Sequence, residues 1–175
     1  PTTDRVREAW MSALHPRLPG ARVVDLFAGS GALGLECLSR GAREAVFVEE
    51  ARGALQALRT NVEALGAGEA ARVVASDVHR WLATQPAGAF DLALADPPYG
   101  TDHPRRLVER WLAHPFAREL WIEHRTGETL PGIPGPDTGP GPGPGTGPAP
   151  GAGVTLRERR YGDTTLTTLT LEDPP

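Results

Sequence analysis

Short apolar runs alternate along this chain with segments in which apolar residues recur every three to four positions. The apolar runs have the length of buried strands, and they lie at 22–27, 45–48, 71–75, 90–95 and 120–122. The helical spacing falls between them, at 32–40, 51–65, 78–82 and 104–112. Strands that alternate with helices in this way predict a parallel sheet covered by helices on both faces.

One helix illustrates how the pattern predicts packing. In the segment 51–65, Leu55, Leu58, Val62 and Leu65 recur on one side. We therefore expect the helix to pack against the sheet through these side chains, and to end at the glycine that follows.

The pattern changes near the C-terminus. Residues 131–153 are almost only Gly, Pro, Thr and Ala, a composition typical of a flexible loop that packs no core. Residues 154–161 and 164–171 alternate with a period of two around Gly162-Asp163, which predicts an antiparallel hairpin. The sheet is therefore expected to hold seven strands, mostly parallel, with the hairpin at its end.

A chain of 175 residues has the size of one domain. We divide residues 1–175 into an N-terminal helix at 1–16, an α/β core at 22–125, the Gly/Pro-rich loop at 131–153 and the hairpin at 154–171. In the first helix Val6, Trp10 and Leu14 form the apolar stripe.

Composition excludes several classes of protein. The only cysteine, Cys37, lies among helical leucines, so we expect it in the core and expect no intrachain disulfide. No apolar run reaches membrane-spanning length and no signal peptide opens the chain, which favours a soluble cytoplasmic protein. The five histidines show no metal-ligand spacing, so no metal site is expected. A net charge of −4 does not indicate nucleic-acid binding.

A glycine loop follows the first strand. Gly29-Ser30-Gly31-Ala32-Leu33-Gly34 matches G-x-G-x-x-G and opens a helix, and Glu49 follows at the end of the next strand. This arrangement is typical of a site for a nucleoside-containing cofactor, in which the acid binds the ribose hydroxyls. Asp25 precedes the loop and would oppose a pyrophosphate, but it suits a cationic amine or sulfonium. Asp77 ends the third strand, where it could face an adenine or simply cap the next helix.

Asp96-Pro97-Pro98-Tyr99 follows the fourth strand. Two prolines fix the backbone and remove two donors, so that carbonyl oxygens remain as acceptors. Asp96 adds an acceptor and Tyr99 adds a stacking face, which together suit a planar base held by an exocyclic amine. The alternative is an ordinary strand-ending turn with Tyr99 in the core.

These motifs carry a resemblance. The segment from Asp25 to Glu36 resembles the first motif of class I S-adenosylmethionine-dependent methyltransferases, which have a Rossmann-like fold, and 96–99 resembles the motif of those that methylate exocyclic amines. The opening 1–8 and the segment 160–164 are similar to bacterial 16S ribosomal RNA guanine-N2 methyltransferases of the RsmD type, which modify the guanine numbered 966.

The resemblance implies roles for individual residues. S-adenosyl-L-methionine would be the cofactor, and the target would be 16S ribosomal RNA within a small subunit or an assembly intermediate, bound by a monomer. Asp96, the Pro97 carbonyl and Tyr99 would hold the target base. The cofactor would be held by Asp25, Phe27, Ala28, Gly29, Gly31, Glu49, Asp77, Val78, Thr3 and Arg5.

Other functions remain open on sequence grounds. The motif at 96–99 also occurs where the target is another RNA guanine, a DNA adenine or cytosine, or a protein glutamine. The glycine pattern also fits a nicotinamide-dependent oxidoreductase, although Asp25 and the Pro-Pro motif argue against it. A non-catalytic RNA-binding protein with this fold would be expected to lose Asp96 or the glycines. The family usually carries a short basic hairpin before residue 1, part of its RNA grip.

Overall fold

The computed structural model describes residues 4–132 and 153–172. Most of the predicted Gly/Pro-rich loop and Thr3 therefore lie outside the described residues. The helices are α1 (Asp4–Leu14), the 3-10 turn η1 (His15–Arg17), α2 (Ala32–Ser39), α3 (Arg52–Ala64), α4 (Val78–Leu82) and α5 (His103–Ala113). The strands are β1 (Arg22–Leu26), β2 (Glu44–Glu49), β3 (Ala71–Ala75), β4 (Phe90–Ala95), β5 (Ala117–Arg125), β6 (Val154–Tyr161) and β7 (Thr164–Leu171).

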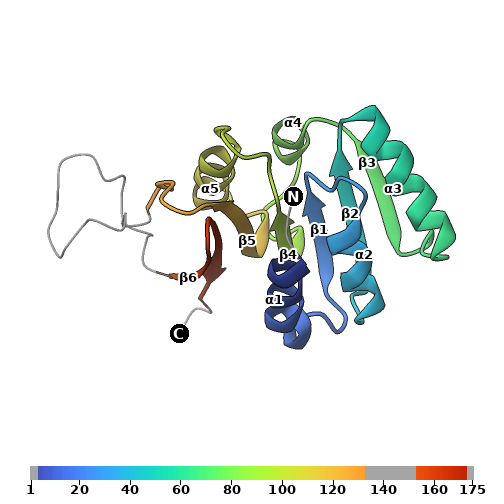
Figure 1. The fold of residues 1–175 in the computed structure, drawn as a ribbon, viewed down its shortest axis with the longest axis horizontal. Helices are drawn as coiled ribbons and strands as arrows, with labels where there is room; N and C mark the ends of the chain where they lie inside the picture. The colour runs from blue at the N-terminus through green and yellow to red at the C-terminus, as the bar shows by residue number, and fades with distance from the viewer. Residues whose placement is uncertain (1–3, 133–152, 173–175) are drawn as a thin grey trace, which may run out of the picture.

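The strands form one seven-stranded sheet in the order β3-β2-β1-β4-β5-β7-β6, which runs from right to left in Figure 1. Strands β1 to β5 pair in parallel, and β7 pairs antiparallel with both β5 and β6. The predicted mixed sheet with a C-terminal hairpin is thus confirmed. The strand order reverses between β1 and β4, and ligands bind at such a switch point in open α/β sheets.

Helices cover both faces of the sheet, as the alternation predicted. One hydrophobic cluster joins a face of the sheet to α1, α2 and α3 through Trp10, Cys37 and Leu58. The other joins the opposite face to α4 and α5 through Trp81 and Trp111. The burial of Cys37 confirms its predicted place in the core.

Two details of the sequence prediction were wrong. Leu65 is 67% exposed because α3 ends at Ala64 and Gly66 turns the chain with φ +62°. The fifth strand spans nine residues rather than the predicted three. It is longer because β4 and β7 pair with it on its two sides, so that it buries polar residues such as Glu123 that an apolar pattern does not mark.

No helix in the described ranges has both the length and the apolar character needed to cross a bilayer.

Candidate active site

A cavity of about 540 Å³ opens at the carboxyl ends of the central parallel strands. It lies at the switch point of the sheet, where the loops after β1, β2, β3 and β4 meet. Its lining residues are Phe27, Glu49, Glu50, Ala51, Ser76, Val78, Asp96, Pro97, Pro98, Tyr99 and His103.

The glycine loop after β1 brings the start of α2 close to the sheet. Gly31 has φ +86°, and a Cβ there would lie 2.4 Å from Leu58 Cδ1. A Cβ at Gly34 would lie 2.4 Å from a Phe47 ring carbon. The last glycine therefore serves helix packing, whereas the first two allow the backbone to turn.

Phe27, at the start of this loop, has φ +57° and is the one non-glycine residue of the described ranges with positive φ. A bulky side chain in the left-handed region costs about 1–2 kcal/mol. The strained backbone of Phe27 therefore lies at the cavity, which this residue lines.

Glu49, at the end of β2, is held in one orientation by backbone donors. Its Oε2 accepts from Gly29 N at 2.8 Å, and its Oε1 accepts from Glu50 N at 3.0 Å and Ala51 N at 2.9 Å. A carboxylate has about four acceptor positions, so Glu49 can still accept a hydrogen bond from a hydroxyl group of a bound ligand.

Asp25 is buried, 2% exposed, and its Oδ2 accepts from Gly34 N at 3.0 Å. Burial raises the pKa of Asp25 to about 8, and the carboxylates of Asp96 and Glu49 contribute to the rise against the opposing hydrogen bond from Gly34. The side chain thus joins β1 to α2 and is not among the residues that line the cavity.

Asp77 caps α4, the second of its two predicted roles. Its Oδ1 accepts from Arg80 N at 2.8 Å, and this hydrogen bond is the main reason that the pKa of Asp77 is lowered. The residues on either side of it, Ser76 and Val78, line the cavity.

The segment Asp96-Pro97-Pro98-Tyr99, which we call the lip, forms the wall of the cavity after β4. Thr101 Oγ1 donates to the Pro98 carbonyl at 2.8 Å and fixes the turn. The Tyr99 hydroxyl donates to Glu123 Oε1 at 3.1 Å. Tyr99 is 41% exposed, so the alternative reading of a core tyrosine is wrong.

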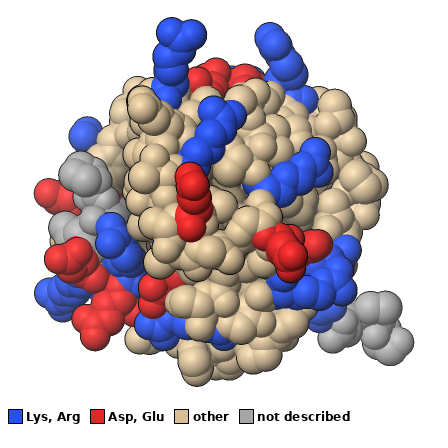
Figure 2. All heavy atoms as spheres, turned by 90° about the vertical axis from the view of Figure 1, so that its right-hand side faces the viewer, with Lys and Arg blue, Asp and Glu red and all other residues tan. Residues whose placement is uncertain are grey.

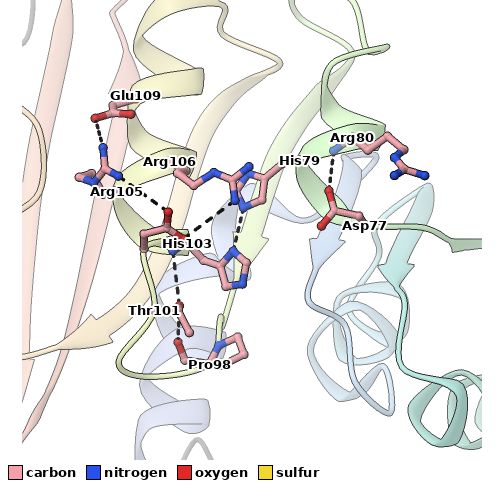
Figure 3. A network of polar contacts seen from close by, with 10 residues as sticks. Asp77, His79, Arg80, Pro98, Thr101, His103, Arg105, Arg106 and Glu109 are labelled. Atoms are coloured by element: carbon pink, nitrogen blue, oxygen red, sulfur yellow. Dashed lines mark hydrogen bonds and ion pairs between the residues drawn. The ribbon is translucent and has the colours of Figure 1, made fainter.

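A histidine pair that the sequence did not reveal lies beside the cavity, which His103 lines and His79 does not. His79 Nε2 lies 2.8 Å from His103 Nδ1, with the two rings stacked at an interplanar angle of 16° (Figure 3). The Phe27 ring lies 4.7 Å from the His103 ring. The pair connects the first turn of α4 to the first turn of α5. These residues are 24 positions apart, and no spacing rule links them.

The pKa of His79 is lowered, mainly by burial and further by Arg106 and His103. Asp77 and Asp102 act in the opposite direction. The hydrogen bond between the two rings requires at least one of them to be neutral on the bonded nitrogen. The described residues contain no group of three or more His, Cys, Asp or Glu side chains placed to hold a metal ion.

The structure brings part of the predicted set together. The predicted residues that line the cavity are Phe27, Glu49, Val78, Asp96, Pro97 and Tyr99. Those outside its lining are Asp25 on β1, then Ala28, Gly29, Gly31 and Asp77 in the adjoining loops, and Arg5, which is exposed on α1. The sequence did not single out Glu50, Ala51, Ser76 or His103.

The arrangement has two chemically different ends. The Glu49 carboxylate, fixed by backbone amides, offers acceptors for hydroxyl groups. The lip offers a carboxylate, a proline carbonyl and an exposed aromatic ring. One cavity can therefore take a ribose-containing molecule at one end and a planar amine at the other.

The chain is similar in sequence to known proteins. Residues 1–131 match the model of the family described as Conserved hypothetical protein 95. Ribosomal RNA small subunit methyltransferase D of Escherichia coli is 40% identical over 143 residues, which cover 77% of this chain and 68% of that protein.

Solved structures share the fold. Escherichia coli yhhF superposes with a TM-score of 0.77 at 30% identity, covering 99% of this chain and 88% of that one. An RNA methyltransferase from Salinibacter ruber in complex with S-adenosyl-L-homocysteine has a TM-score of 0.66 at 11% identity, covering 100% and 95%. The chain belongs to the Conserved hypothetical protein 95 family, the family of ribosomal RNA small subunit methyltransferase D.

Proposed function

We propose that this protein uses S-adenosyl-L-methionine to methylate the exocyclic N2 amine of a guanine in 16S ribosomal RNA, position 966 by resemblance to its family. The observation that carries the proposal is that Glu49 and the lip line the same cavity. The name of the Escherichia coli relative supports ribosomal RNA of the small subunit as the substrate. In this proposal residues 1–175 act as one methyltransferase domain, monomeric and cytoplasmic, on a small subunit or an assembly intermediate.

The residues present fit the cofactor. Glu49 keeps acceptor capacity for the ribose hydroxyls, and Ser76 and Val78 border the cavity where the adenine would lie. Gly29 and Gly31 allow the backbone to approach the ligand closely. The sulfonium of the bound cofactor supplies an electrophilic methyl group.

The lip would position the target amine. The lone pair of guanine N2 is delocalised into the ring, so the amine must turn before it can attack a methyl carbon in line. Asp96 and the Pro97 carbonyl would accept hydrogen bonds from the two N–H groups of the amine and so direct its lone pair into the cavity. This is catalysis by orientation and by placed acceptors.

The base must leave its stack to enter the cavity. Stacking on the exposed ring of Tyr99 would offset part of the cost, at about 1–3 kcal/mol per base. The lip favours an exocyclic amine of any planar base, and the family relationship favours the ribosomal RNA guanine among them.

Transfer of radiolabelled methyl groups tests the proposal. Purified protein is incubated with labelled cofactor and with naked 16S RNA, small subunits or DNA. Label is expected in RNA, whether naked or in small subunits, and not in DNA. Asp96→Ala is expected to bind the cofactor but to transfer no label. Label in DNA, or near-normal turnover by Asp96→Ala, would contradict the proposal.

A further inference from the structure

The antiparallel end of the sheet separates its side chains onto two faces. Directly opposed residues of neighbouring strands share a face. The rows on one face are Trp121–Thr168–Arg157, Glu123–Leu166–Arg159 and Arg125–Thr164–Tyr161. Trp121 and Leu166 pack in the hydrophobic cluster that contains α1, so this face lies on the α1 side of the sheet.

The opposite face carries different rows. They are Leu120–Leu169–Leu156, Ile122–Thr167–Glu158 and His124–Thr165–Arg160. Leu120, Ile122 and Leu169 belong to the cluster that contains α5. Arg160 therefore points away from Arg157 and Arg159, although all three lie on β6.

On the α1 side, Arg125, Arg157 and Arg159 are exposed and form no ion pair with another described residue. The arginines at the start of α5 differ, because Arg105 pairs with Asp102 and Glu109, and Arg106 pairs with Asp102. Arginines without a neighbouring carboxylate are the ones best able to neutralise the phosphates of a polyanion.

Two acidic groups on the same face are buried, and a third, the exposed Glu172, accepts a hydrogen bond from Thr155 Oγ1 at 2.7 Å. Glu119 is buried and pairs with Arg17 at 2.9 Å. Glu123 is 1% exposed and accepts a hydrogen bond from the Tyr99 hydroxyl. The solvent therefore meets arginine and tyrosine side chains along these rows, a combination suited to phosphates and to stacked bases.

This face is continuous with the lip. The guanidinium carbon of Arg125 lies 5.8 Å from the centroid of the Tyr99 ring. Thr164, in the same row as Arg125 and Tyr161, lies 2.6 Å from the Tyr99 hydroxyl. A strand lying on the face would thus reach the cavity at Tyr99.

We propose that the surface formed by Arg125, Arg157, Arg159 and Tyr161, here the arginine face, binds the backbone of the single-stranded RNA that leads the target base to the lip. This inference rests on the proposed function, and it assigns the RNA contact to one face of one hairpin. Arg160 and the paired arginines of α5 lie outside it.

Binding of a fluorescein-labelled single-stranded RNA oligonucleotide, measured by anisotropy over a range of salt concentrations, tests the arginine face. Each phosphate contact contributes about fourfold to affinity near 0.15 M salt, so Arg157→Gln/Arg159→Gln should raise the Kd roughly tenfold. The slope of log affinity against log salt should become shallower by about 1.4. Both residues are exposed on an edge strand, so the fold should persist.

Two controls remove arginines elsewhere. Arg59→Gln/Arg72→Gln removes two exposed charges from α3 and β3, at the end of the molecule where Figure 2 shows both signs scattered. Arg160→Gln removes a charge from β6 on the opposite face. Both controls should bind RNA within about twofold of wild type, because neither removes a charge from the arginine face.

The outcomes separate this inference from the proposed function. If wild type transfers methyl groups to RNA but Arg157→Gln/Arg159→Gln binds RNA like either control, the arginine face is refuted and the function stands. A defect seen with small subunits but not with naked RNA also refutes it, since the partner would then be protein. If wild type labels no RNA substrate, the proposed function itself fails.

Discussion

The hydroxyl of Tyr99 lies 2.6 Å from Thr164 Oγ1, across 65 residues of sequence. The phenol has one proton, which it donates to Glu123 Oε1 at 3.1 Å. The threonine hydroxyl must then donate to the phenol oxygen. The first residue of β7 thus holds the ring of the lip, and the C-terminal hairpin becomes part of the candidate active site.

Removing the hydroxyl of Tyr99 should slow methyl transfer and leave cofactor binding unchanged. Tyr99→Phe keeps the stacking ring but loses both hydroxyl contacts. A typical hydrogen bond contributes about 0.5–1.5 kcal/mol, so kcat/KM for RNA should fall roughly threefold to tenfold. Steady-state kinetics with calorimetric cofactor titration measures both effects.

A double-mutant cycle with Thr164→Val identifies the partner. Because Thr164 and Tyr99 share one hydrogen bond, the effects of the two changes on kcat/KM should be less than additive. Strict additivity would show that β7 does not hold the lip.

The His79–His103 pair should make the cavity sensitive to mild acid. The pKa of His79 is lowered below its ordinary value, so the unfolded chain binds more protons below about pH 6.5 and stability falls as the pH drops through that value. Protonation of both rings would also break their hydrogen bond. Cofactor affinity and melting temperature should therefore decline from pH 7.5 to 5.5.

A glutamine can imitate the Nε2 side of histidine without titrating near neutral pH. His79→Gln should therefore flatten the decline, whereas His79→Ala should weaken cofactor binding at every pH. An unchanged pH profile in His79→Gln would show that the pair does not control the cavity.

Asp25 should act in the opposite direction. Its folded pKa of about 8 lies above the unfolded value of 3.8, so its protonation contributes stability below pH 4 that is lost as the pH rises to 8. Asp25→Asn keeps an acceptor for Gly34 N and removes the titration. Relative to wild type, its free energy of unfolding should increase between pH 5 and pH 8, by about 4 kcal/mol at most. Urea unfolding at both pH values measures this difference, and a constant difference would contradict the assignment.

Two helical glycines should respond oppositely to alanine. A Cβ at Gly34 would lie 2.4 Å from the Phe47 ring and 3.1 Å from Asp25 Oδ2, so Gly34→Ala should destabilise the protein by about 1–3 kcal/mol. Gly53, in α3, has no atom within 4 Å of its Cβ position, so Gly53→Ala should stabilise by about 0.5–1 kcal/mol. Thermal unfolding of both variants tests this, and a loss of stability in Gly53→Ala would contradict it.

The sequence predicted what short-range patterns determine. The bounds of β3, β4 and the two hairpin strands match those of the apolar and alternating runs in the sequence. The length of β5 escaped prediction, since its buried Glu123 and His124 depend on partners far away in the sequence, Tyr99 of the lip and Thr167 of β7.

The candidate site divides in the same way. Glu49 and the lip were predicted because fixed motifs place them at strand ends, and both line the cavity. Asp25 matched a motif as well, yet the direction of its side chain is set by Gly34 on the facing helix. The contact between His79 and His103 arises only when α4 and α5 begin at the same edge of the sheet.

Identification of the methylated nucleoside tests whether the protein methylates guanine N2. RNA labelled by the wild-type protein is digested to nucleosides and separated by chromatography with mass spectrometry, with Asp96→Ala as the matched control. N2-methylguanosine is expected from the wild-type reaction and none from Asp96→Ala. Methyl label in adenosine or cytidine, or N2-methylguanosine formed equally by both proteins, would contradict it.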